Sequence, residues 1–262
     1  MKYLKVFIAW VLFLLLASPS HAIDEDSLKQ RIAKHLEKVT AEAKIQEPFE
    51  DLSIRSPTGS KLFRTASNGI VLVVTANDTM GSGVVLSNNG LIVTNWHVVE
   101  NETRVGIIFK EATRQDKISL KKEDIFIAKV LKTDPVRDLA LLQIVSIPPS
   151  LTVLRLGSIS QVEVGEDVFA ISHPVGLLWS YTEGVISQIR PNYVMKTREG
   201  TTHRATYIQT QTVISEGSSG GALFNYDGQL IGILVGSLGP GLNFAIAINE
   251  IKEFIKSTLE KR

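Results

Sequence analysis

Short runs of β-branched and other apolar residues succeed one another through most of the chain, and they constrain the fold more than any other feature. No helical periodicity separates the runs, whereas neighbouring parallel strands need a long crossover between them. The runs form two groups, at 70–74, 83–86, 91–94, 105–109, 125–131 and 139–145, and at 168–171, 185–189, 207–210, 230–235 and 244–248. Asn88-Asn89-Gly90 and Asp227-Gly228 are typical of hairpin turns. The pattern predicts an all-β fold, either two antiparallel β-barrels or a sandwich.

Helices are predicted on both sides of the β-rich region. Residues 24–27 offer acidic and hydroxyl caps, and apolar residues then recur at helical spacing at Leu28, Ile32, Leu36, Val39 and Ala43. The same spacing returns near the C-terminus at Ile251, Phe254, Ile255 and Leu259. Residues 46–67 hold two prolines and little periodicity, which indicates a linker or loop. We expect an N-terminal helix and linker at 23–67 and one domain at 68–262, with barrels at about 68–150 and 160–248 and a closing helix at 249–260.

The first 22 residues have the pattern of a secretory signal peptide. Lys2 and Lys5 precede an apolar run at 6–17, and Ser20-His21-Ala22 places small residues at positions −3 and −1 of a cleavage site. A transmembrane anchor is the alternative, but spanning a bilayer takes about 18 to 20 apolar residues. The pattern predicts cleavage after Ala22 and a periplasmic or secreted protein, with no membrane contact after signal cleavage.

Composition excludes several classes of function. The 262 residues include no cysteine, which excludes disulfide scaffolds, cysteine zinc sites and cysteine nucleophiles. Lysine and arginine number 28 against 27 aspartates and glutamates, so no basic excess favours a nucleic-acid partner. Histidine-based chemistry must use one of five histidines, at positions 21, 35, 97, 173 and 203.

Three short motifs contain residues suited to acyl transfer. His97 directly follows a predicted strand. Asp138 begins a very apolar strand, and a carboxylate buried there needs a partner, which is Arg137 or another base on one interpretation and a histidine on the other. Ser219 lies in the glycine-rich segment 216–221, between two hydrophobic runs. A serine hydroxyl needs a base to remove its proton, a histidine can take and return that proton, and a carboxylate can fix the histidine tautomer.

The order of these residues along the chain distinguishes among the known Ser-His-Asp arrangements. An α/β-hydrolase needs a histidine after the serine, but the last histidine here is His203. The subtilisin order begins with aspartate on an α/β scaffold, which the strand pattern does not provide. The order His97, Asp138, Ser219 is that of chymotrypsin-like proteases and agrees with the all-β prediction. Asp134 is the rival acid, and Ser218 is the rival nucleophile.

The motifs resemble those of trypsin-like serine proteases of the HtrA/DegP type, over about 68–256 of the chain. Similar segments are the histidine block at 81–85 and 89–99, the aspartate block at 137–142, a middle segment at 165–171 and 184–187, and the serine block at 208–210 and 217–221. The resemblance implies a chymotrypsin-like double β-barrel with its active site between the barrels. It also implies peptide-bond hydrolysis without a metal or cofactor. Family members usually carry PDZ domains after the protease, and none is expected here because the sequence given stops at Arg262.

The resemblance also implies a role for each residue. Ser219 is the expected nucleophile, His97 the general base and Asp138 the residue that orients it. The backbone N–H groups of Gly217 and Ser219 are expected to form the oxyanion hole. The expected substrate pocket is apolar, which predicts cleavage after uncharged or aliphatic residues, and is lined by Val213, Leu234, Val235, Gly236 and Phe244.

Protein or peptide substrates are therefore the expected partners. The helix at 28–43 is expected to pack on its own barrel, with a homo-oligomer contact as the alternative. Two other functions share the pattern: a secreted pseudo-protease that acts as a binding scaffold, and an esterase-type acyl hydrolase on the same triad. Digestive trypsin-like enzymes carry an aspartate just before the serine, which pairs with a newly cut N-terminus. Ser218 at that place is uncharged, so activity is not expected to need such a terminus.

Overall fold

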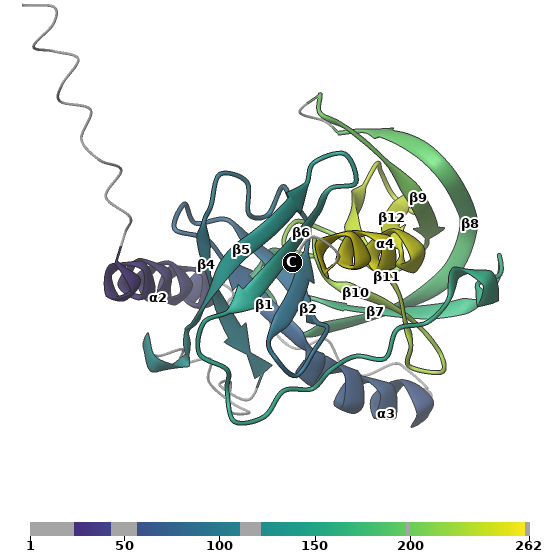
Figure 1. Ribbon diagram of the computed structural model, residues 1–262. Helices are drawn as coiled ribbons and strands as arrows, with labels where there is room; N and C mark the ends of the chain where they lie inside the picture. Colours follow the sequence, from purple (N-terminus) through teal and green to yellow (C-terminus); the bar gives the residue numbers. More distant parts are fainter. Residues whose placement is uncertain (1–23, 43–56, 111–121, 198–199, 260–262) are drawn as a thin grey trace, which may run out of the picture.

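The computed structural model describes residues 24–42, 57–110, 122–197 and 200–259, and the predicted signal segment lies outside them. Within these ranges the strands form two closed six-stranded barrels, so the all-β, double-barrel prediction is confirmed (Figure 1). The first barrel contains β1 (Ile70–Val74), β2 (Met80–Val85), β3 (Leu91–Thr94), β4 (Arg104–Phe109), β5 (Phe126–Asp134) and β6 (Leu139–Ile144). The second contains β7 (Asp167–Ser172), β8 (Ser180–Lys196), β9 (Thr202–Thr210), β10 (Ala222–Asn225), β11 (Leu230–Ser237) and β12 (Asn243–Ala247).

All neighbouring strands in both barrels are antiparallel. The order around the first barrel is β1-β2-β3-β6-β5-β4, and β1 pairs with β4 to close it. The second follows β10-β11-β12-β9-β8-β7, and β10 pairs with β7. The predicted hairpin turns join β2 to β3 and β10 to β11, with Gly90 and Gly228 at positive φ. Closure leaves no continuous sheet edge exposed in either barrel.

The apolar core explains why several strands are continuous apolar runs rather than alternating ones. On β1, Val71 and Val73 point into the interior of the first barrel. Ile70, Leu72 and Val74 on its other face join a larger cluster that also contains residues of the second barrel and of the helices. Both faces of the strand are therefore buried, which removes the polar alternation of a half-exposed strand.

The N-terminal helix α2 (Glu25–Glu42) packs on its own barrel, as expected. Leu28, Ile32 and Leu36 are buried, and the Arg31 guanidinium donates to the carbonyl of Ala76 at 2.8 Å. The barrel thus covers Leu28, Ile32 and Leu36, the three apolar residues of α2 that are buried in the described part of the helix. The closing helix α4 (Ile248–Leu259) is also confirmed and lies against β11 and β12 (Figure 1).

The loop predicted over 46–67 is wrong for its second half, where helix α3 (Pro57–Ala66) forms. Pro57 begins this helix, where a missing N–H costs no helical hydrogen bond. Leu62 and Phe63 pack against the core, and the Phe63 ring meets Tyr181 edge-on at 6.1 Å. The proline and Gly59 concealed the helix in the sequence.

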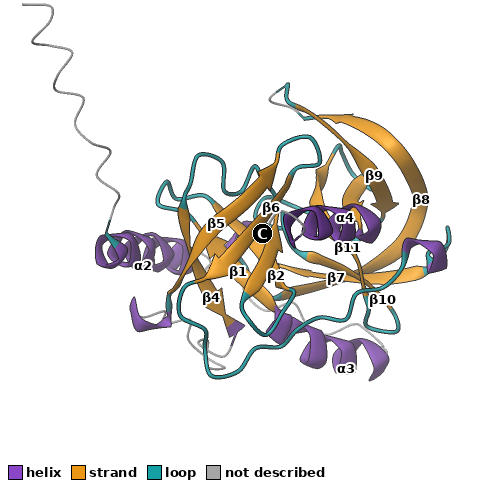
Figure 2. Ribbon diagram, viewed as in Figure 1, coloured by secondary structure: helices purple, strands orange, loops and turns teal. Residues whose placement is uncertain are grey.

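Two further differences lie in the second barrel. Strand β10 is not predicted, because it has only four residues and follows the glycine-rich segment directly. Strands β8 and β9 extend well beyond the residues predicted for them (Figure 2). The prediction missed their outer parts because these contain many polar residues. The extended hairpin that they form matters for the site, since it contributes one side of the cleft.

Candidate active site

Two neighbouring strands of the first barrel bring His97 and Asp138 together. Strand β3 ends at Thr94, β6 begins at Leu139, and Thr94 pairs with Ala140. His97 follows the one strand and Asp138 precedes the other, so antiparallel pairing places both at one end of the barrel. The Nδ1 of His97 lies 2.7 Å from Oδ2 of Asp138, and the His97 backbone N–H donates to Oδ1 at 3.0 Å.

The two side chains differ sharply in exposure. The Asp138 side chain is 1% exposed, whereas that of His97 is 39% exposed. A carboxylate accepts hydrogen bonds and does not donate them, so the proton of the short contact belongs to Nδ1 of His97. This assignment leaves Nε2 as the basic nitrogen of the ring.

Ser219 belongs to the same cleft but comes from the second barrel. It lies in the loop between β9 and β10, and one cavity of about 910 Å³ is lined by both His97 and Ser219. The Ser219 hydroxyl donates to the carbonyl of Val235 at 3.3 Å. That distance is long for a hydroxyl donor, so the hydrogen bond is weak and gives little resistance to rotation of the side chain.

Both rival residues make structural contacts instead. Asp134 accepts from the backbone N–H of Arg137 at 3.1 Å and from its guanidinium at 2.8 Å. Ser218 is completely buried, and its hydroxyl oxygen accepts from the backbone N–H of Ser215 at 3.2 Å. Ser219, rather than Ser218, is therefore the serine that lines the cavity.

The backbone N–H of Gly217 has no hydrogen-bond acceptor among the residues that the structure describes. The preceding carbonyl, that of Glu216, accepts from Val175 N–H at 2.7 Å. Because the N–H and C=O of a trans peptide point in opposite directions, Gly217 N–H points away from Val175. Gly217 has a φ of 85°, and a side chain there would place its Cβ 2.5 Å from the carbonyl oxygen of His173. Only glycine fits this position.

Ser219 N–H is arranged in the same way. The carbonyl of Ser218 accepts from Gly221 N–H at 2.9 Å, and Ser219 N–H has no acceptor within the described ranges. The Ser219 carbonyl accepts from Ser82 N–H of the first barrel at 2.7 Å, which ties the loop to β2. Gly220 lies so close to the Ser82 carbonyl that any side chain would collide with it. The loop therefore contains two backbone donors, Gly217 N–H and Ser219 N–H, that have no acceptor within the described ranges.

The predicted pocket residues divide into two sets. Val213, Val235 and Gly236 line the cavity, although Val213 is 67% exposed and lies at its rim. Leu234 and Phe244 do not line it, because both are buried in the core. Side chains alternate along a strand, so Leu234 points inward where Val235 faces the cleft.

Sequence reasoning missed much of the cleft lining. The β8–β9 hairpin contributes residues nearly a hundred positions beyond His97, a proximity that spacing alone does not reveal. Two carboxylates, Glu100 and Glu216, are among the described lining residues, and no lysine or arginine is. Further lining residues that were not predicted are Met195, Thr197, Thr201, His203, Ile214 and Asn243.

The other described histidines have different surroundings. His203 lines the cavity, but its Nδ1 lies 2.8 Å from the carbonyl oxygen of Pro135, which can only accept. His35 on α2 lies 3.5 Å from Asp78 at the surface. His173 is fully buried. Of the described histidines, His97 alone combines cleft exposure with a buried carboxylate partner.

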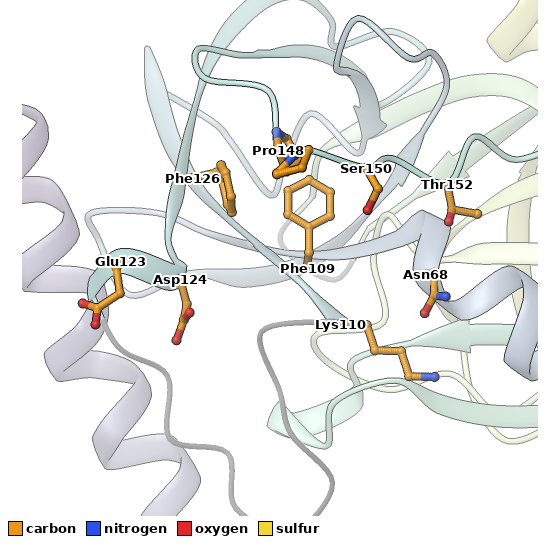
Figure 3. A pocket seen from close by; sticks show the side chains of 10 residues that line it. Asn68, Phe109, Lys110, Glu123, Asp124, Phe126, Pro148, Ser150 and Thr152 are labelled. Carbon is orange, nitrogen blue, oxygen red and sulfur yellow. The ribbon is translucent and has the colours of Figure 1, made fainter.

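A second, smaller hollow of about 210 Å³ lies on the first barrel (Figure 3). Phe109, Phe126 and Pro148 form its apolar part, and Lys110 lies at its edge, where burial lowers the pKa of the ammonium group. Its lining contains no histidine and none of the three predicted catalytic residues. Of the two cavities, the larger one is therefore the candidate active site.

The described ranges, 24–42, 57–110, 122–197 and 200–259, also bear on metal and membrane binding. They contain no group of three or more histidine, aspartate or glutamate side chains arranged to hold a metal ion. None of the helices in these ranges has both the length and the apolar character needed to cross a membrane.

Comparison with known proteins places the chain among peptidases. The model of the trypsin-like peptidase domain matches residues 81–233. Serine protease HTRA1A of Danio rerio is 37% identical over 69% of this chain and 35% of its own length. Serine endoprotease DegS of Haemophilus influenzae is 33% identical over 70% of this chain and 51% of its own. Periplasmic serine endoprotease DegP of Escherichia coli is 34% identical over 69% and 36%, respectively.

The chain thus spans between about a third and a half of the length of these relatives. The matched region runs from β2 to β11 and includes His97, Asp138 and Ser219. The double barrel, the family model and the relatives agree. The chain therefore belongs to the trypsin-like peptidase family, and its relatives there include serine proteases of the HtrA and DegP type.

Proposed function

We propose that the chain is an exported serine endopeptidase that cleaves peptide bonds through a Ser-His-Asp triad and an acyl-enzyme intermediate. The observation that carries the proposal is the His97–Asp138 contact of 2.7 Å, made by a carboxylate that is 1% exposed, in the cleft that Ser219 also lines. A buried carboxylate that fixes a half-exposed imidazole is the arrangement that general-base activation of a serine requires.

The proposed reaction has two stages. Ser219 Oγ attacks the scissile carbonyl carbon while His97 Nε2 takes the hydroxyl proton, and a tetrahedral oxyanion forms. The C–N bond then breaks, and His97 returns the proton to the leaving amine, which leaves the acyl group on Ser219. Water, which gives its proton to the same histidine, then attacks the acyl carbon, the bond from that carbon to Ser219 Oγ breaks, and His97 returns the proton to Oγ as the acid leaves. Asp138 holds the Nδ1–H tautomer throughout and stabilises the imidazolium.

The oxyanion is proposed to bind to the backbone N–H groups of Gly217 and Ser219. The absence of acceptors for both groups within the described ranges supports this role. Donors that are already oriented require no reorganisation when the negative charge develops, and the loss of one such donor costs about 10² to 10³ in turnover.

Primary specificity is proposed to favour uncharged or aliphatic residues. The lining near Ser219 includes the apolar residues Ile214 and Val235. Glu216 is exposed, and Glu100 lies on the histidine side of the cleft, so neither is a buried partner for a substrate cation. A peptide library would show cuts after aliphatic residues, and a strong preference for cuts after Arg or Lys would contradict this proposal.

Export is proposed from the signal-peptide pattern at 1–22. It is supported by the relationship to DegP of Escherichia coli, which is described as periplasmic. N-terminal sequencing of the native protein should read from Ile23. An intact Met1 in the cytoplasmic fraction would overturn this part of the proposal.

Casein digestion tests the function as a whole. The chain should degrade casein, a serine-protease inhibitor should stop the degradation, and Ser219→Ala should reduce it by about 10⁴ to 10⁶. Hydrolysis of ester but not peptide substrates would indicate the esterase instead. Binding of casein without cleavage, unchanged in Ser219→Ala, would indicate the pseudo-protease scaffold.

A further inference from the structure

His173 is the buried ionisable group that the proposed mechanism does not use. It directly follows β7, is 0% exposed, and meets the edge of Trp179 at 4.8 Å between ring centroids. Its Nδ1 lies 2.9 Å from the hydroxyl oxygen of Ser82, while its Nε2 has no hydrogen-bond partner among the described residues. A buried polar atom without a partner is uncommon and calls for an explanation.

The Ser82 hydroxyl makes three contacts on strand β2. His173 N–H donates to its oxygen at 3.2 Å, His173 Nδ1 lies 2.9 Å away, and the hydroxyl reaches the carbonyl oxygen of Gly217 at 3.1 Å. A hydroxyl has one proton and can accept two. All three contacts are therefore satisfied by one arrangement, in which Nδ1–H of His173 donates to Ser82 and Ser82 donates to Gly217.

The opposite tautomer would be costly. If Nε2 carried the proton, that N–H would be buried without an acceptor, and Ser82 would have to donate to Nδ1. The Gly217 carbonyl would then lose the Ser82 proton. The bare Nε2 of the first arrangement is an unused acceptor, which is the less costly of the two defects.

Two contacts hold the peptide groups that flank Gly217, one from the 173–175 turn and one from Ser82 on β2. Val175, two residues after His173, donates to the Glu216 carbonyl at 2.7 Å, and Ser82 donates to the Gly217 carbonyl. Gly217 joins these two peptide groups through a φ of 85°. The direction of Gly217 N–H is thus fixed from both sides, once by the backbone of the 173–175 turn and once by the His173–Ser82 pair.

We propose that His173 is a positioning residue for the oxyanion hole, in which it acts as a neutral Nδ1–H donor that directs the Ser82 proton to the Gly217 carbonyl. This inference rests on the proposed function, because it assigns the oxyanion role to Gly217 N–H. Burial lowers the pKa of His173 to about 3, which keeps the imidazole neutral at ordinary pH. The Ser82 hydroxyl and the Trp179 ring, which both contact the imidazole, carry no charge.

Three variants separate the donor from the shape of the ring. His173→Phe keeps an aromatic ring against Trp179 but removes the donor, and should lower kcat by about 10-fold to 100-fold with KM changed by less than about twofold. His173→Asn places an amide N–H near the former Nδ1 and should retain kcat to within about threefold of wild type. Ser82→Ala should resemble His173→Phe. The control His35→Phe, on α2 and outside the cleft lining, should leave kcat unchanged.

The double variant tests whether the two residues act in one chain. His173→Phe combined with Ser82→Ala should cost no more in kcat than the worse single variant, because each already breaks the same connection. Multiplying losses would overturn the inference, and so would an Asn variant as impaired as the Phe variant. Urea unfolding of each variant shows whether the comparison is made between folded proteins.

A direct observation of the tautomer does not depend on activity. Long-range ¹⁵N–¹H correlation of histidine-labelled wild-type protein, assigned through His173→Asn, should show the proton of His173 on Nδ1 and none on Nε2. A proton on Nε2 would overturn the inference. If wild type failed to cleave any peptide, the proposed function would fall, while the tautomer would still report whether His173 directs the Ser82 proton.

Discussion

Asp138 combines a strained backbone with several hydrogen bonds. Its backbone has a φ of 58°, a left-handed conformation that costs a non-glycine residue on the order of 1 to 3 kcal/mol. Its carbonyl accepts from the Asn95 side chain at 2.9 Å and from Trp96 N–H at 3.2 Å, and its carboxylate receives both His97 contacts. These hydrogen bonds offset the strain and fix the carboxylate before any substrate binds.

Replacing this carboxylate by an amide should remove most of the activity without unfolding the protein. Asp138→Asn should lower turnover at neutral pH by about 10⁴, the magnitude measured for this change in the chymotrypsin-type template, because an amide N–H favours the wrong histidine tautomer. Peptide hydrolysis measures the effect. Asp134→Asn is the matched control, and it should stay within about threefold because that carboxylate contacts Arg137 instead. Equal losses in both variants would contradict the assignment.

His173 should also make the stability of the fold depend on pH. Burial lowers its folded-state pKa from 6.5 to about 3, so the unfolded chain binds a proton that the folded protein rejects. The neutral, buried imidazole therefore makes its full contribution to the free energy of unfolding above pH ~6.5. This contribution is lost as the pH falls toward ~3, by about 1.4 kcal/mol per pH unit. Urea titrations from pH 7 to pH 4 measure this slope.

The comparison with His173→Asn isolates the effect, because asparagine does not titrate. The slope of wild type should exceed that of the variant by about one proton per molecule over that range. Identical slopes would show that His173 accepts a proton in the folded state.

Single residues differ in how far the sequence reveals them. The positions of His97 and Asp138 were predictable because each lies at the end of a recognisable strand, and the pairing of these two strands brings the side chains together. Ser82 and His173 were not, because their contact joins positions 91 apart and exists only once the barrels have docked. Phe244 was expected in the pocket but lies in the core, since the register of a short strand decides which face a residue occupies.

At the scale of elements, the apolar runs located most strands because burial on both faces made them conspicuous. The elements that were missed lack that signal. Helix α3 begins with a proline and contains Gly59, and β10 has only four residues. The polar outer parts of β8 and β9 are held by pairing with each other, which no composition reveals.

Helix α2 should contribute to stability through packing on its own barrel rather than through association. Ile32 is 0% exposed, and a Cβ on Gly106 would come within 2.5 Å of its side chain. Ile32→Ala should lower the free energy of unfolding by about 3 to 4 kcal/mol. Lys34→Ala, on the exposed face, should change it by less than about 0.5 kcal/mol.

Urea unfolding and sedimentation velocity together check this prediction. The Ile32→Ala loss should be independent of protein concentration, with the same molecular mass before and after the substitution. A stability that rises with protein concentration, or a change in mass with Ile32→Ala, would show that the helix mediates an oligomer contact instead.

At the scale of the whole molecule, the site exists only where the barrels meet. The first barrel supplies His97 and Asp138, the second supplies Ser219, and Ser82 on β2 contacts the Ser219 carbonyl. The fold class could be predicted from strand grouping, and motif order singled out His97, Asp138 and Ser219, which the fold brings to one end of the cleft. The orientation of the loop could not, because it depends on contacts from both barrels that are separated in the sequence.

These contacts bear on whether a free N-terminus is needed. Ser218 is buried and uncharged, and the loop is held by Ser82 and Val175 rather than by an ion pair at the residue before Ser219. An inserted ammonium group would find no carboxylate at that position. Acetylating or extending the mature N-terminus should therefore change peptide turnover by less than about tenfold. A larger loss, with the circular dichroism spectrum unchanged, would contradict this expectation.

The most direct test of the central claim is active-site labelling with a fluorophosphonate, followed by peptide mapping. The reagent reacts with a serine that is activated by a base beside an assembled oxyanion hole. Wild type should carry one label per chain, on Ser219, and His97→Ala should react slower by about 10⁴. A label on Ser218, equal labelling in His97→Ala, or no label on folded wild-type protein would contradict the account.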